Sequence, residues 1–167
     1  MNHFELFEIP LSFFPDLQQV RQNYYRLSRH YHPDLQDSES ESIRALEMSS
    51  QVNEAYKILQ NFEARVRYLL QVKGVLKDGD KESVSPGFLM EMMDVNENLM
   101  DAKMDGDENR ILQALDEIDQ VHSNLMVEWE QTCRQYDAGH AEDLLQEIKD
   151  YYLRNQYLKR LKNQVNP

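Results

Sequence analysis

Apolar residues recur at helical spacing along nearly the whole chain of 167 residues, and this periodicity constrains the fold more than any other feature. Glycine and proline number only five each and fall mainly where the periodic segments end. No segment alternates between apolar and polar residues as a half-buried strand would. The pattern predicts an all-α protein, with helices expected over residues 4–7, 17–31, 41–70, 88–104, 109–136 and 141–164.

Residues 74–87 interrupt this periodicity in the middle of the chain. Four of the ten glycines and prolines fall there, among charged residues and serines, which is the composition of a linker. We therefore expect residues 1–73 to form one domain, built around a helical hairpin. Residues 88–167 hold three amphipathic helices with short connections, which predicts an antiparallel three-helix bundle.

The net charge is −12, and most of it lies in the second half, where residues 77–167 hold 10 Lys and Arg against 20 Asp and Glu. An acidic surface argues against nucleic acid as a partner, because phosphates need a basic surface. No apolar run reaches the roughly 18 to 20 residues that span a membrane, and the N-terminus lacks a signal peptide's pattern. The single cysteine, Cys133, cannot form an internal disulfide, so we expect a cytoplasmic location.

The helix expected over 17–31 separates an apolar face from a basic one. At 100° per residue, its basic side chains Arg21, Arg26 and Arg29 lie opposite the apolar ones. Guanidinium groups bind carboxylates in two-point geometry, which suits an acidic partner. From charge alone, however, an ordinary solvated face is the better explanation. The apolar face consists of Leu17, Val20, Tyr24, Leu27 and Tyr31.

The tripeptide His32-Pro33-Asp34 directly follows this helix. Taken alone, Pro33 ends the helix and Asp34 caps a turn. Three blocks of sequence nevertheless resemble the J domain in order and spacing: FELFEIP at 4–10, YYRLSRHYHPD at 24–34 and NEAYKIL at 53–59. Together they carry the resemblance across residues 1–72.

In J domains, the basic helix and the His-Pro-Asp loop dock on an ATPase chaperone of the HscA/DnaK type and trigger its hydrolysis of ATP. The resemblance implies that His32 and Asp34 make polar contacts across this interface, while Pro33 keeps the loop rigid. Neither side chain would act as acid or base, since the ATP belongs to the partner. The residues assigned to the contact are Arg21, Tyr25, Arg26, Arg29, His32, Pro33 and Asp34.

The helix expected over 88–104 has a second two-faced pattern. We expect its core face to hold Phe88, Met92, Val95 and Leu99, with Leu89 near the edge between the faces. The opposite face mixes methionines with carboxylates: Met90, Met93, Asp94, Glu97 and Asp101. Methionine adapts to irregular apolar partners, and carboxylates would orient a basic one. The pattern alone leaves a binding face and a solvated face equally open.

A J domain followed by an acidic three-helix bundle resembles the HscB family, the dedicated co-chaperones of iron–sulfur cluster assembly. The segments FLME at 88–91 and LMVE at 125–128 are similar to that family's C-terminal domain, although Met93 and Asp94 stand where Leu and Glu are usual. Eukaryotic members add a cysteine-rich metal module at the N-terminus, and its absence indicates the bacterial type. The resemblance implies that an IscU-like scaffold protein is bound by Leu89, Met90, Met93, Asp94, Glu97, Asp101 and Tyr151, with Tyr152 as the alternative aromatic.

These patterns predict a co-chaperone, not an enzyme. We expect the chain to stimulate an HscA/DnaK-type ATPase and to deliver an IscU-like scaffold to it, since two sites on one chain raise the local concentration of the scaffold. One alternative is a general J-domain co-chaperone for unfolded clients, although Gly/Phe-rich and zinc-ribbon segments are absent. The other, a helical hydrolase, lacks a set of catalytic groups. We expect no cofactor and no metal site, because one thiol cannot hold a cluster.

Overall fold

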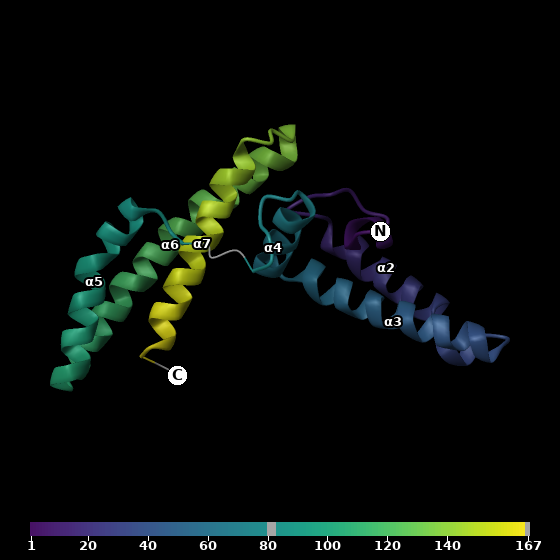
Figure 1. Cartoon of the computed structure of the whole chain (residues 1–167), viewed down its shortest axis with the longest axis horizontal. Helices are drawn as coiled ribbons and strands as arrows, with labels where there is room; N and C mark the ends of the chain where they lie inside the picture. The colour runs from purple at the N-terminus through teal and green to yellow at the C-terminus, as the bar shows by residue number, and fades with distance from the viewer. Residues whose placement is uncertain (80–82, 166–167) are drawn as a thin grey trace. The chain divides into compact units, whose positions relative to one another are not determined.

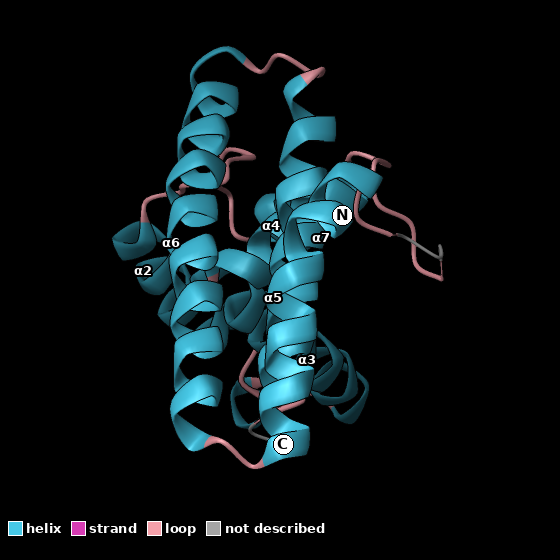
Figure 2. Cartoon of the chain, turned by 90° about the vertical axis from the view of Figure 1, so that its left-hand side faces the viewer, coloured by secondary structure: helices cyan, strands magenta, loops and turns pink. Residues whose placement is uncertain are grey.

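The fold is taken from a computed structural model that describes residues 1–79 and 83–165. Within these ranges every regular element is helical and none is a strand, which confirms the expected all-α class (Figures 1 and 2). The chain divides into two compact units, Met1–Leu76 and Lys77–Pro167. The elements are α1 (His3–Leu6), α2 (Leu17–His30), the 3₁₀ turn η1 (Pro33–Leu35), α3 (Glu39–Gln60), α4 (Phe62–Val72), α5 (Pro86–Asp105), α6 (Glu108–Gly139) and α7 (Leu144–Asn163).

In the first unit, α2 and α3 form an antiparallel hairpin, and α1 and α4 pack against α3 (Figure 1). Asp16 caps α2, as its carboxylate accepts hydrogen bonds from the amides of Gln18 and Gln19. Across the hairpin, the rings of Tyr24 and Tyr56 stack at 4.1 Å. The buried core includes Phe4, Phe7, Phe13, Val20, Leu27, Val52, Leu59, Val66 and Leu69.

Leu17 does not belong to this core, and the expectation that it packs inward is wrong. Its side chain is half exposed, because Leu17 is the first residue of α2 and lies before the turn in which Val20 becomes buried. Helical phase therefore identifies the packed face of α2 but not where along the helix packing begins.

The single helix expected over 41–70 is two helices, because Asn61 leaves the helical conformation at φ −105° and ψ 126°. The Asn61 side chain accepts a hydrogen bond from the Ala64 amide and so caps α4. Arg65, which is buried, donates to the carbonyl of Leu59 at 2.6 Å and to that of Phe13 at 2.7 Å. The break is stable because Arg65 binds a carbonyl that the end of α3 leaves unpaired.

The second unit is an antiparallel three-helix bundle in which α6 packs against both α5 and α7 (Figures 1 and 2). Gly106 closes α5 at φ 65°, a left-handed conformation that glycine adopts without a Cβ clash. Asp107 then caps α6 through the Arg110 amide. The core includes Phe88, Met92, Leu99, Ile118, Leu125, Trp129, Tyr136, Leu145, Ile148 and Leu158.

Part of the predicted linker at 74–87 is helical. Ser85 accepts a hydrogen bond from the Phe88 amide, and Pro86 occupies the first turn of α5. Proline suits that position, because the first amides of a helix have no intrahelical partner. The helix therefore begins at Pro86 and not at Phe88 as expected. Residues 80–82 of the linker and 166–167 of the C-terminal domain lie outside the described residues.

Candidate functional site

The His-Pro-Asp loop is a short capped turn. The Nδ1 atom of His32 accepts a hydrogen bond from the Asp34 amide at 3.2 Å, so His32 caps η1. Its distance of 3.8 Å from the Asp34 carboxylate is too long for a hydrogen bond. With Nδ1 accepting, the neutral ring carries its hydrogen on Nε2.

Hydrogen bonds from both sides hold this loop against the hairpin. The Ser42 hydroxyl of α3 donates to the Pro33 carbonyl at 3.2 Å. The side-chain amide of Gln36 donates through Nε2 to the carbonyls of His32 and His30, at 3.0 and 3.3 Å. The side chains of His32 and Asp34 remain exposed. The loop is therefore held in place by its backbone, while its polar side chains are available to a partner.

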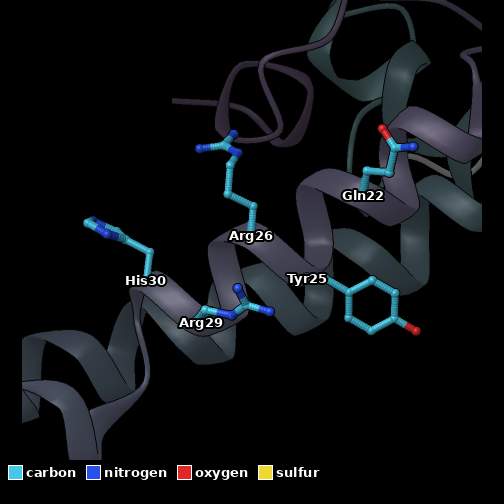
Figure 3. Close-up of a pocket in the computed structure, with 5 residues that line it drawn as sticks. All are labelled: Gln22, Tyr25, Arg26, Arg29 and His30. Carbon is cyan, nitrogen blue, oxygen red and sulfur yellow. The ribbon is translucent and has the colours of Figure 1, made fainter.

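The basic face of α2 lies beside this loop, and Arg21, Arg26 and Arg29 are exposed, as predicted from the helical phase; Tyr25 is exposed as well. Arg21 lies over the Tyr25 ring at 5.8 Å, and the hydrogen bond to Tyr25 raises the pKa of its guanidinium. An open hollow of about 470 Å³ runs along this face (Figure 3). It is lined by Gln22, Tyr25, Arg26, Arg29 and His30.

Arg26 is not a free cation. Its guanidinium lies 2.9 Å from the carboxylate of Glu8, which precedes α2 in the chain. In Figure 3, Arg26 accordingly points away from Arg29 and Tyr25. Sequence periodicity could not reveal this pair, because the two residues are 18 positions apart and Glu8 lies outside any helix.

A smaller hollow of about 160 Å³ opens where α2, the loop and α3 meet. Its polar lining comes from both arms of the hairpin, so it belongs to the same surface as the His-Pro-Asp loop. Arg44 and Met48 of α3 were not predicted as site residues, since they lie on the far arm from the basic helix. The lining residues are His30, Tyr31, Gln36, Glu41, Arg44, Ala45 and Met48.

The methionine and carboxylate face of α5 has the exposure that its phase predicts. Met90 and Met93 are 75% and 57% exposed, and the carboxylates Asp94, Glu97 and Asp101 are also exposed. Leu89, at the edge between the faces, is exposed to a smaller extent, at 42%. The expected core residues Phe88, Met92 and Leu99 are buried, whereas Val95 is only partly so. The helical phase is thus confirmed, while binding at this face stays a prediction.

Tyr151 lies mostly inside the bundle, with 9% of its surface exposed. Its hydroxyl donates to Glu147 at 3.1 Å, and burial, followed by this bond, raises its pKa. The Arg154 guanidinium lies 5.9 Å from the Tyr151 ring and 5.2 Å from that of Phe88. Tyr151 is therefore linked to the start of α5, beside Leu89, but leaves little surface for a partner to contact. Tyr152 lies 6.5 Å from the Trp129 ring.

The described residues hold no group of three or more His, Cys, Asp or Glu side chains placed to bind a metal ion. Their helices also include none with the length and apolar composition to cross a membrane. The single thiol, Cys133, is buried in the bundle. What the exposed groups can do is bind: a basic face with a fixed polar loop on one unit, and an acidic apolar face on the other.

Two family models match the chain, one in each of its two compact units. Residues 2–68 match the DnaJ domain. Residues 84–166 match the model described as the HSCB C-terminal oligomerisation domain.

Relatives match over nearly the full length. A co-chaperone protein HscB homolog from Colwellia psychrerythraea is 33% identical, with 99% of this chain and 98% of that protein covered. One from Vibrio vulnificus is 29% identical, with 99% and 95% covered. Among solved structures, the chaperone HscB from Vibrio cholerae matches with TM-score 0.60 and 26% identity over 99% of both chains. Human co-chaperone protein HscB matches with TM-score 0.67 and 25% identity, over 99% of this chain and 81% of that one.

Proposed function

The chain belongs to the HscB family of J-domain co-chaperones, and from this premise we propose that it stimulates the ATPase of an HscA/DnaK-type chaperone and delivers an IscU-like scaffold protein to it. The observation that carries the proposal is the pairing of a capped His-Pro-Asp loop on the first unit with an exposed methionine and carboxylate face on the second. The chain supplies binding surfaces, and the chemistry of ATP hydrolysis belongs to the partner.

On the first unit, the partner of the basic face is an acidic surface of the ATPase. Arg21, Arg26 and Arg29 supply positive charge that steers association. The loop then adds directed contacts, because its backbone is held by Ser42 and Gln36 while the His32 side chain is exposed. A loop that is already ordered loses little conformational entropy on docking, so more of the contact energy remains for binding.

On the second unit, the proposed scaffold site consists of Leu89, Met90, Met93, Asp94, Glu97 and Asp101 along α5. The methionines supply adaptable apolar contact, and the carboxylates favour a scaffold surface that carries basic groups. Tyr151 is linked to the start of this site through Arg154, which lies over the rings of both Tyr151 and Phe88, and it contributes at most the small part of its surface that is exposed. Binding the scaffold and the ATPase through one chain raises the local concentration of one at the other.

The proposed compartment is the cytoplasm, whose reducing conditions are compatible with a single cysteine, Cys133, that forms no disulfide. The decisive measurement is steady-state ATP hydrolysis by the chaperone, with the chain and the scaffold added separately and together. We expect the chain alone to stimulate turnover and the two together to stimulate it more than the sum of their separate effects. A chain that leaves the turnover of the ATPase unchanged would refute the proposal.

The second candidate is a general J-domain co-chaperone for unfolded clients. It is favoured by the exposed methionines of α5, since methionine-rich surfaces adapt to many apolar partners. The two functions differ in the state of the client. An unfolded polypeptide should compete with the folded scaffold for α5 only if this face binds clients of many kinds. Competition measured by fluorescence anisotropy therefore distinguishes the general co-chaperone from the scaffold-specific one.

A further inference from the structure

Helix α5 concentrates exposed methionines on one side. Met90, Met93, Met100 and Met104 are exposed, the last two at 55% and 84%, whereas Met92 on the core side is only 1% exposed. At 100° per residue, the four exposed side chains fall within a sector of about 80°. Four of the five large apolar side chains exposed on this helix therefore carry a thioether, and the fifth is Leu89.

A thioether sulfur reacts with hydrogen peroxide by donating a lone pair to one peroxide oxygen. The sulfur–oxygen bond forms as the oxygen–oxygen bond breaks, and the leaving hydroxide takes the proton from the transferred oxygen and departs as water. The sulfur loses two electrons, which the peroxide gains, and methionine becomes methionine sulfoxide. Sulfoxide reductases reverse the change with electrons from thiols. The rate depends on access to the sulfur, so the exposed residues of α5 should react well before Met92.

We propose that Met90, Met93, Met100 and Met104 form a reversible oxidation switch, in which peroxide weakens and reductases restore the binding of the scaffold protein. The proposal rests on the proposed function for the identity of the client, and it extends the α5 face to Met100 and Met104. Neither residue was predicted as a site residue, although both share the phase of Met93.

The position of the sulfurs determines what oxidation changes. A sulfoxide oxygen is a strong hydrogen-bond acceptor, and the neighbouring carboxylates of Asp94, Glu97 and Asp101 cannot donate to it. In the free protein water hydrates the new oxygen, so the fold is unaffected. In the complex the same oxygen would lose its water against an apolar partner surface, which disfavours binding. Burial of Met92 keeps the reaction out of the core, where it would disrupt packing.

The alternative is that methionine is present only for its adaptability. A variant with all four residues changed to leucine (M90L, M93L, M100L and M104L) separates the two explanations, because leucine keeps the helix propensity and the apolar surface but cannot accept oxygen. The switch requires this variant to keep, after peroxide, whatever affinity for scaffold it has before peroxide.

The experiment treats the full chain alone with hydrogen peroxide and removes the peroxide with catalase before scaffold is added, so that the scaffold's own thiols are spared. Mass spectrometry of peptides locates the oxygen, and exposed Met1, present in both proteins, reports the dose. We expect the four α5 methionines to react before Met92, the thermal melt to stay unchanged, and the dissociation constant to rise about tenfold or more and to recover after reductase treatment.

Two results would overturn the switch: oxidised wild type that binds scaffold as tightly as untreated protein, or a leucine variant that loses affinity on oxidation as the wild type does. Untreated wild type that binds no scaffold would instead overturn the proposed function, and the switch with it. That failure is seen before any peroxide is added, so the two cannot be confused.

Discussion

The guanidinium of Arg26 lies 2.9 Å from the carboxylate of Glu8, so one arginine of the basic face is already paired within the chain. Glu8 adopts a left-handed conformation with φ 54°, which costs a residue with a Cβ about 1 kcal/mol. Both side chains are largely exposed, and an exposed ion pair adds little stability. Its main effect is therefore on the charge that the face offers to the ATPase.

Removing the carboxylate in Glu8→Gln should release Arg26 and speed association with the ATPase. We expect the association rate to rise by about two- to threefold at low salt, with little change in the melt. Stopped-flow fluorescence would measure it. Glu47→Gln is the control, since it changes net charge equally on the exposed side of α3. Equal effects of the two variants would show that only net charge matters.

His32→Gln should reduce ATPase stimulation to near background. Glutamine keeps an acceptor that could cap the Asp34 amide, so the turn should survive, but it removes the exposed imidazole. Helicity and scaffold binding should persist, because neither depends on this side chain. Steady-state ATPase assays, with circular dichroism as the control for folding, provide the test. Full stimulation by the variant would contradict a role for the loop.

Arg26→Ala and Arg29→Ala should each weaken binding to the ATPase, and salt should weaken binding of the wild type similarly. The expected loss is about 1 kcal/mol for Arg29 and smaller for Arg26, because Glu8 already pairs with the Arg26 guanidinium. Titration calorimetry at two salt concentrations would measure it. If affinity does not depend on salt, the arginines form only a solvated face.

His3 should make the first unit less stable in mild acid. Burial is the largest cause of its lowered pKa, which Glu54 only partly offsets, and its ring stacks on Tyr68 at 4.1 Å. Below the ordinary pKa of 6.5 the unfolded chain binds more protons than the folded one, so stability falls as pH falls from 7 to 5. His3→Phe should keep the stacking and flatten this dependence.

Urea unfolding at both pH values would show the effect. The single tryptophan, Trp129, reports the second unit by fluorescence, so a change seen only in circular dichroism belongs to the first. His30→Gln removes an exposed imidazole from the same unit and serves as the control. Equal pH dependence in His3→Phe and wild type would exclude His3 as the source.

The spacing of apolar residues predicted the helices, because in a helix this spacing also indicates which side is buried. The phase of α5 separated buried Met92 from exposed Met90 and Met93, as the structure shows. The break at Asn61 was missed because the apolar period continues across it, from Leu59 to Phe62. What stabilises the break is Arg65, whose partners Phe13 and Leu59 are identified only by the tertiary fold.

Site residues that depend on contacts between distant segments were the hardest to predict. The Glu8–Arg26 pair joins a loop to a helix, and no spacing rule applies to it. Tyr151 is buried, whereas its neighbour Tyr152 is more exposed. An error of one residue in the helical phase of α7 is therefore enough to assign the wrong tyrosine to the site. Met100 and Met104, by contrast, share the phase of Met93 and could have been included from sequence.

Substitutions on the exposed face of α5 should leave the stability of the free protein nearly unchanged but weaken its binding to the scaffold. In one variant, serine replaces both Met90 and Met93. In the other, lysine replaces both Glu97 and Asp101. All four side chains are exposed, so stability should change by about 0.5 kcal/mol or less per site. Stimulation of the ATPase in the absence of scaffold should stay at the wild-type level, because the His-Pro-Asp loop belongs to the other unit.

The two pairs should weaken scaffold binding in different ways. Serine at Met90 and Met93 removes apolar contact, so the complex should dissociate faster with little change in association. Lysine at Glu97 and Asp101 reverses the charge offered to a basic scaffold surface, so association should slow and its salt dependence should shrink or invert. Surface plasmon resonance at two salt concentrations separates these rates, and a thermal melt checks the fold. Intact stability with unchanged binding would mean that the client contacts another face of the bundle.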